Sequence, residues 1–215
     1  MRTYGPEMRR VVQALALLVP ASVMVLGVAQ KNRAQYYVKA DQTADLHHPK
    51  LITAKQNCEN WGLAAGLETV LAQQDVPLDQ NFWVMRLNYG ELCVDHTPSM
   101  ELLAKVVNQE FVLDDGRHVR LELQFTPGAP TYVDGLLNRL RHEQAALLLW
   151  RGHPYLLVGA TYDERIWPDG SREFVIKELR LTDTFAKQPA VTFQNGRDDP
   201  AEIDGVVSVS VVKQS

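Results

Sequence analysis

Two Asp-Gly pairs place the strongest constraint on how this chain folds. Asp115-Gly116 and Asp169-Gly170 each lie between extended runs, and Asp-Gly is typical of the tight turn that joins two antiparallel strands. After the first pair, apolar and polar residues alternate from Val119 to Phe125, which is the pattern of a half-buried strand. The sequence therefore predicts two β-hairpins and a sheet that is mostly antiparallel.

Three further segments are expected to be extended. Residues 145–163 form two nearly continuous apolar runs around Gly152-His153-Pro154, and apolar runs bounded by a turn indicate buried strands. Residues 173–185 supply the return strand of the second hairpin, and the alternating stretch 206–212 closes the chain. The predicted strands thus lie in the second half of the sequence.

A helix with a small-residue first half is predicted from Trp61 to Gln74. Its apolar residues recur at three- and four-residue steps and give one broad stripe; they are Leu63, Ala64, Leu67, Val70 and Leu71. Gly66 costs about 1 kcal/mol of helix stability relative to alanine. We therefore expect either close packing of another element against Gly66 or local strain in the helix.

Shorter segments complete the predicted helical part. Residues 80–95 are expected to form a short helix or turn before a loop, and another helix is expected over residues 131–143. Between them, Thr97 is the expected helix cap and Pro98 the first helical residue. Because helices come mainly before strands, the predicted class is α+β, with a central buried helix packed on the sheet.

The N-terminal segment, residues 1–29, has the pattern of an export signal. Arg2, Arg9 and Arg10 precede an uncharged apolar run from Val11 to Ala29, as in a signal peptide with a small-residue cleavage site. The run is also just long enough to span a bilayer, so an uncleaved membrane anchor is the alternative. Either way, we expect the folded part to be exported and to be periplasmic, secreted or anchored outside the cytoplasm.

The rest of the chain is expected to form one domain. Residues 30–50 are polar without a sustained period, which favours a flexible arm, and residues 51–215 form the predicted domain. Without residues 1–29 the chain has 19 basic and 25 acidic side chains, a net charge of −6. Since no basic patch remains, nucleic acid is not an expected partner, and contact with a membrane is expected only through the N-terminal segment. His47-His48 lacks further ligands at metal-site spacing, so no metal or other cofactor is expected.

Two cysteines, Cys58 and Cys93, support opposite interpretations. A Cys58–Cys93 disulfide would close a loop of 36 residues and stabilise an exported domain by roughly 3–4 kcal/mol in the chain-entropy model. Alternatively, Cys58 is a nucleophile at the start of the predicted helix, where the helix dipole favours a thiolate. His153 at the start of one strand and Asp183 at the end of the next would then complete a triad.

The region around Cys58 resembles the papain-like cysteine peptidase superfamily, and within it the bacterial group related to bacteriocin leader peptidases. The likeness covers residues 51–185. In these enzymes the central helix starts at the nucleophile and continues through small residues to an aliphatic-glutamate pair. Cys58, Ala64-Ala65 and Leu67-Glu68 follow this pattern.

The second half of the pattern surrounds the candidate histidine. In the family, a histidine opens a strand that ends in Gly-x-x-x-Asp or a similar motif, as His153 through Gly159 and Asp163 do, and the third triad member follows a hairpin, where Asp183 stands. The resemblance implies a papain-like fold and a thiol hydrolase of the peptidase or amidase type. It also implies a peptide or protein substrate, and Gln56 as the donor to the oxyanion.

Two departures from the family keep a non-catalytic interpretation open. Gln56 lies only two residues before Cys58, closer than the family's glutamine, which lies several residues before the cysteine. Trp61-Gly62 follows Cys58 by three and four residues, and sliding the alignment to fit this pair puts tryptophan in the nucleophile's place. On this second hypothesis the chain is a papain-like scaffold, held by a Cys58–Cys93 disulfide, that binds a peptide or a protein.

Overall fold

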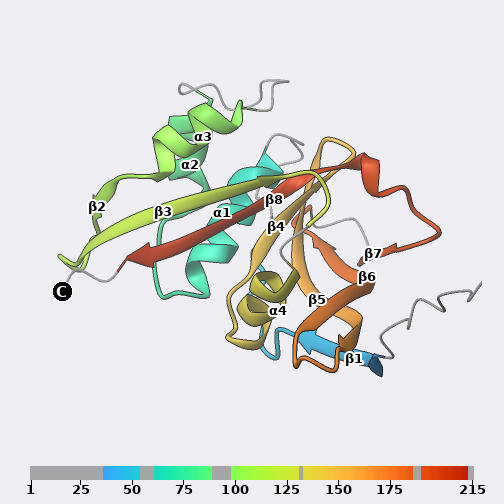
Figure 1. Ribbon diagram of the computed structural model, residues 1–215. Coiled ribbons are helices and arrows are strands. Elements are labelled where there is room, and N and C mark those ends of the chain that lie inside the picture. The colour runs from blue at the N-terminus through green and yellow to red at the C-terminus, as the bar shows by residue number, and fades with distance from the viewer. Residues whose placement is uncertain (1–35, 54–60, 89–97, 131–132, 186–189, 213–215) are drawn as a thin grey trace, which may run out of the picture. The chain divides into compact units, whose positions relative to one another are not determined.

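A single sheet of eight strands organises the part of the chain that the computed structural model describes, residues 36–53, 61–88, 98–130, 133–185 and 190–212. Figure 1 shows its long central strands and the helices around them. The strands are β1 (Tyr37–Asp45), β2 (Glu110–Val112), β3 (His118–Pro127), β4 (Ala146–Trp150), β5 (His153–Ile166), β6 (Arg172–Asp183), β7 (Val191–Gln194) and β8 (Ile203–Val212). The helices are α1 (Trp61–Ala72), α2 (Gln80–Leu87), α3 (Met100–Val107) and α4 (Val133–Arg141), followed by a 3₁₀ turn at Pro200–Glu202.

Antiparallel pairing runs through the sheet in the order β2-β3-β8-β4-β5-β6-β7. The last strand, β8, lies between β3 and β4 and pairs with both of them. Strand β5 has two partners on one edge, because β4 pairs with residues 153–157 and β1 pairs with residues 159–166. Its other edge pairs with β6 along almost its whole length.

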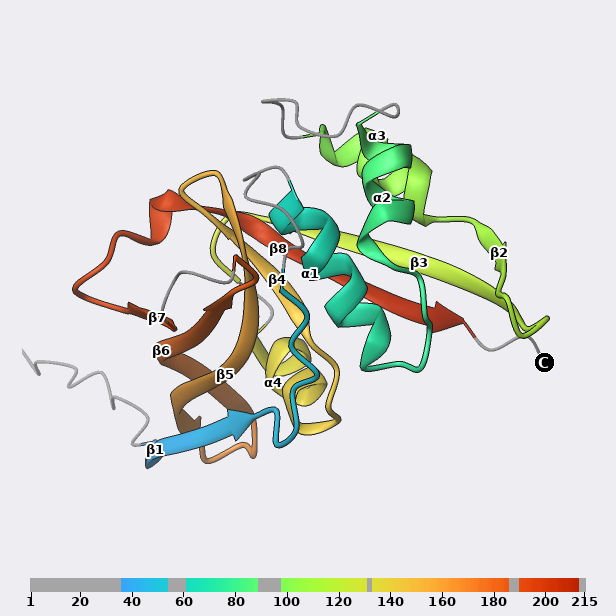
Figure 2. The ribbon, with the colours of Figure 1, turned by 180° about the vertical axis from the view of Figure 1, so that it is seen from behind.

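Helices α1 and α4 cover opposite faces of this sheet. Helix α4 stands in front of the strands in Figure 1, and α1 stands in front of them in the reverse view of Figure 2. The stripe of α1 is buried, with Leu67, Val70 and Leu71 at most 1% exposed. A Cβ at Gly66 would lie 2.8 Å from Leu147 Cδ2 of β4. Close packing of the sheet against the helix therefore explains the glycine.

The predicted class is confirmed as α+β with a mostly antiparallel sheet. The first Asp-Gly pair joins β2 to β3 and the second joins β5 to β6. In β3 the buried residues are Val119, Leu121 and Leu123, with exposed residues between them. No helix in these residue ranges is long and apolar enough to cross a membrane.

The predicted start of the third helix is wrong by two residues. Ser99 rather than Thr97 is the cap of α3, because its Oγ accepts a hydrogen bond from Leu102 N at 3.1 Å. Pro98 consequently precedes the cap, where its missing N–H removes no helical hydrogen bond.

The expected flexible arm, residues 30–50, contains strand β1. A register shift between Lys39 and Gln42, with Asp41 at a φ of 53°, interrupts the two-residue period of this strand. Because of this irregularity, the residues of β1 do not show the apolar–polar alternation by which a strand is recognised in a sequence. Ion pairs also fix β1 to the sheet: Lys39 Nζ lies 3.2 Å from Glu164 Oε2, and Arg180 Nε donates to Asp45 Oδ1 at 3.0 Å.

Candidate functional site

His153 and Asp183 lie together at one end of the β5–β6 ribbon. His153 is the first residue of β5 and Asp183 the last residue of β6, and the ladder places Asp183 opposite Tyr155. His153 Nε2 is 3.1 Å from Asp183 Oδ1. The β5–β6 hairpin thus brings these two residues together, and their roles as base and orienting group stay a prediction.

The two side chains differ in their access to solvent. The Asp183 side chain is fully enclosed, whereas the His153 side chain is 27% exposed. Asp183 Oδ1 also accepts a hydrogen bond from Phe185 N at 2.8 Å, while Oδ2 has no hydrogen-bond partner among the described residues. The His153 contact has hydrogen-bonding distance but not the angle of a good hydrogen bond. The carboxylate of Asp183 is therefore buried and held in place by the chain, while the imidazole that it contacts is partly open to solvent.

The first turn of α1 contacts the end of the β5–β6 ribbon that carries His153 and Asp183. Thr184 Oγ1 donates a hydrogen bond of 3.0 Å to the carbonyl oxygen of Gly62. A Cβ at Gly62 would lie 3.5 Å from Pro154 Cγ and 4.0 Å from His153 Cε1. Both are ordinary van der Waals distances, so the first turn of α1 lies close to the histidine ring. The beginning of the described helix and the His153-Asp183 pair thus form one site.

Tyr155 belongs to this site although the sequence analysis did not single it out. Its ring lies 4.7 Å from the His153 ring at an angle of 60°. Burial raises the pKa of the Tyr155 phenol above its usual value, and the negative charge of Asp183 raises it further. Tyr155 follows His153 by two residues on one strand, and residues at this spacing share a face of the sheet. That periodicity is the signal that could have identified it.

Three residues of the sequence hypotheses lie outside the described ranges. They are Cys58, its predicted oxyanion partner Gln56, and Cys93. The predicted triad is therefore represented by its histidine and its aspartate, and both the nucleophile and the alternative disulfide stay predictions.

The pair has the chemistry of a general base. An aspartate that accepts a hydrogen bond from Nε2–H favours the neutral tautomer in which Nδ1 carries the lone pair, and it stabilises the ring when Nδ1 takes up a proton. In this structure the distance suits such a bond, whereas the angle does not. With Nε2 facing Asp183 at 3.1 Å, Nδ1 is the nitrogen left to exchange a proton with a nucleophile. The orientation of the ring thus suits proton transfer on the side away from the carboxylate.

No group of three His, Cys, Asp or Glu side chains in the described ranges is arranged to hold a metal ion. His47, from the adjacent histidines of the sequence analysis, lies 2.6 Å from Glu143 Oε1 through its Nδ1. No family model matches the chain, and no curated protein or solved structure matches it significantly.

Proposed function

We propose that this protein is an exported papain-like thiol hydrolase, of the peptidase or amidase type, whose catalytic groups are Cys58, His153 and Asp183. The observation that carries the proposal is the contact of His153 with the enclosed Asp183 beside the first turn of α1. A thiol nucleophile needs a base and a group that orients the base. Two of these three groups lie together beside the first turn of α1, which begins three residues after Cys58 in the sequence.

Few residues separate Cys58 from the first turn of α1, which lies beside His153. Three residues of extended chain span at most about 11 Å, so Cys58 lies within that reach of Trp61. Cys58 also precedes Gly62 by four residues, the spacing at which two residues share one face of a helix. This short separation in the sequence is compatible with a thiol that acts together with His153.

In the proposed reaction, Cys58 attacks the carbonyl carbon of a peptide or another amide or acyl substrate. His153 Nδ1 takes the thiol proton and returns it to the leaving group, while Asp183 holds the ring and stabilises its positive charge. Gln56 and a backbone N–H near the helix start donate to the oxyanion. Water then cleaves the thioester with His153 again acting as the base.

The alternative proposal is a non-catalytic papain-like module that binds a peptide or protein. The position of Gly62 against His153 Cε1 favours it, because the slid alignment matches Trp61-Gly62 to the nucleophile and its following glycine. Trp61 is only 1% exposed and has no nucleophilic atom. In this case Cys58 and Cys93 form the disulfide and His153 keeps a structural role.

Alkylation kinetics separate the two proposals. For the full chain under reductant, we expect iodoacetamide to modify Cys58 at least about tenfold faster than Cys93 at pH 6, and His153→Ala to abolish the difference, because the imidazolium stabilises the thiolate. Mass spectrometry of the digest identifies each cysteine. His118→Ala is the control, since His118 is paired with exposed Glu110 on β2.

Two results would contradict the hydrolase. One is equal modification of both cysteines with no response to His153→Ala. The other is a Cys58–Cys93 disulfide in the unreduced digest that makes up nearly all the protein and re-forms after mild reduction. The disulfide result supports the binding module, and equal modification without a disulfide contradicts both proposals.

A further inference from the structure

A second candidate site lies at the other end of the β5–β6 ribbon, on the α4 face of the sheet. It is a pocket of about 820 Å³, which is within the size range of small-ligand sites. Val133, Asp134 and Arg141 come from α4, Glu164 from β5, and Arg172, Glu173 and Phe174 from the start of β6. The site is separate from His153 and does not depend on the proposed function.

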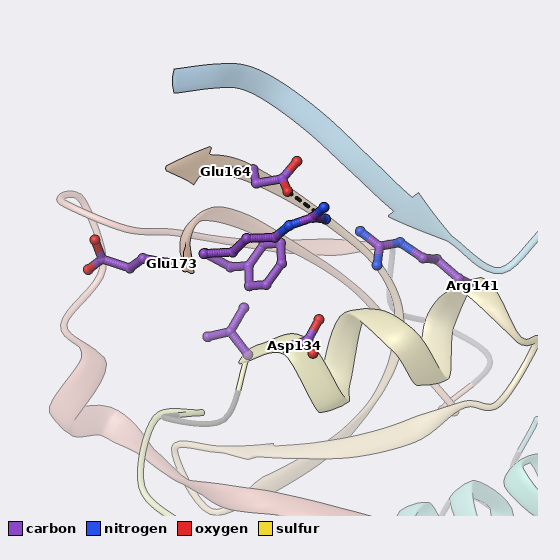
Figure 3. Close-up of a pocket in the computed structure, with 7 residues that line it drawn as sticks. Asp134, Arg141, Glu164 and Glu173 are labelled. Atoms are coloured by element: carbon purple, nitrogen blue, oxygen red, sulfur yellow. Dashed lines mark ion pairs between the residues drawn. The ribbon is translucent and has the colours of Figure 1, made fainter. Parts of the chain in front are cut away.

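The buried acid of this pocket is already neutralised. The Glu164 side chain is 9% exposed and lies between two cations, with Lys39 Nζ 3.2 Å from Oε2 and Arg172 Nη1 3.1 Å from Oε1. Figure 3 shows the Arg172 contact as a dashed line. Oε1 is buried yet makes no hydrogen bond to any described residue. Glu164 therefore holds Lys39 and Arg172 at the pocket, while its own Oε1 is closed to solvent.

Arg141 supplies a positive charge that no carboxylate of the described chain neutralises. Its guanidinium donates to the Tyr162 hydroxyl and lies 5.6 Å from the Tyr162 ring centroid, and it forms no salt bridge to a described residue. Tyr162 accepts from one of five N–H donors, so the others are available to a ligand. In Figure 3 the Arg141 side chain extends from α4 toward Glu164.

The surrounding groups favour one kind of anion. Guanidinium groups bind carboxylates and phosphates in a bidentate manner, but Asp134 and Glu164 also line the pocket. The negative charge of Asp134 disfavours a dianionic phosphate, and its carboxylate accepts hydrogen bonds from N–H groups. Val133 and Phe174 are half-buried and provide an apolar surface, and the Phe174 ring packs 5.8 Å from that of Tyr162.

We propose that this pocket binds the C-terminal residue of a peptide, or an N-acyl amino acid, that has an apolar side chain. The ligand carboxylate lies on Arg141 and within the field of Arg172. Its amide N–H donates to exposed Asp134, and its side chain covers Phe174. These three contacts together define a monoanionic, amide-bearing, apolar ligand.

The test is a titration of the ¹⁵N-labelled full chain with N-acetyl-L-phenylalanine, followed by NMR. We expect shift changes in residues 133–141 and 162–174. The amide derivative, N-acetyl-L-phenylalaninamide, should bind at least about tenfold more weakly, since one charge-assisted contact is worth about that factor. 3-Phenylpropanoate lacks the N–H and should bind roughly three- to tenfold more weakly.

Variants assign the anion contact to one residue. Arg141→Gln should weaken N-acetyl-L-phenylalanine binding about tenfold and leave the amide derivative unchanged. Arg141 is exposed, so the variant is expected to fold, and its spectrum verifies this. Arg120→Gln, at an exposed position on β3, is the control and should have no effect. Equal loss in both variants, no discrimination between acid and amide, no shift changes, or tighter binding of phenyl phosphate would each overturn the proposal.

Discussion

The two ends of the β5–β6 ribbon each enclose one carboxylate but give it different partners. At one end, enclosed Asp183 faces the imidazole of His153, a side chain suited to general acid–base catalysis. At the other end, Glu164 lies between the cationic side chains of Lys39 and Arg172. The first arrangement suits proton transfer, whereas the second fixes charges that can attract a ligand. The following predictions test this difference.

His153→Leu is expected to have the largest effect on stability. Without the imidazole, the Asp183 side chain is enclosed with only the Phe185 N–H as a hydrogen-bond partner in the described chain. An under-satisfied buried carboxylate costs about 2–3 kcal/mol. Urea unfolding at pH 8 measures the loss in the free energy of unfolding.

The matched control for that prediction is His118→Leu. His118 Nδ1 lies 2.9 Å from Glu110 Oε1, but both side chains are more than half exposed, at 56% and 52%. Exposed pairs contribute about 0–1 kcal/mol, so this variant should lose less than about 0.5 kcal/mol. Equal losses in the two variants would show that enclosure of Asp183 has no special cost.

Glu164→Gln is expected to have a smaller effect. Lys39 and Arg172 are 42% and 61% exposed, so both return to water when the negative charge is removed. We expect a loss below about 1 kcal/mol, and less in high salt, because partly exposed ion pairs are weak and screened. Urea unfolding at low and high salt measures it. A loss as large as that of His153→Leu would mean that the two ends do not differ.

Tyr155→Phe is expected to have the smallest effect at neutral pH and a clear one at alkaline pH. The raised pKa of Tyr155 means that the folded chain holds the phenol proton more tightly than the unfolded chain. This contribution to stability is complete below about pH 10 and is lost as the pH rises through the folded-state pKa. Tyr155→Phe should therefore make the decline above pH 10 less steep, by up to about 1.4 kcal/mol per pH unit.

Urea unfolding between pH 8 and 11 provides the measurement. Tyr37→Phe is the control, because Tyr37 is 64% exposed on β1, and its pH profile should match that of the unaltered protein. A Tyr155→Phe profile identical to both would contradict the alkaline dependence.

The sequence predicted the His153-Asp183 end because one short connection determines it. The Asp169-Gly170 turn fixes the register of β5 and β6 and places Asp183 opposite Tyr155. His153 lies two residues from Tyr155 on the same face of β5, so it lies next to Asp183. Tyr155 was missed because the two-residue period was not extended to the neighbours of His153. The helix start at Ser99 was missed because threonine and serine are both common N-cap residues. The local sequence alone does not decide which of Thr97 and Ser99 caps the helix.

The Glu164 end could not be predicted in this way. Lys39 belongs to a strand whose register is interrupted near Asp41, and Arg141 belongs to helix α4, more than twenty residues before Glu164 in the chain. Residues 37–45 have few apolar side chains, so no local pattern distinguishes this strand from an arm. Its order comes from pairing with β5 and from ion pairs with residues more than a hundred positions away.

By itself, the sequence determined the α+β class, the two hairpins, the buried stripe of α1 and the meeting of His153 with Asp183. These depend on periodicity and turn chemistry, which act over a few residues. Only the tertiary structure decided that Gly62 of α1 lies against the His153 ring, that Gly66 admits Leu147, and that β1 joins the edge of β5. Such contacts depend on packing and on the pairing of distant charges, and neither leaves a local pattern in the chain.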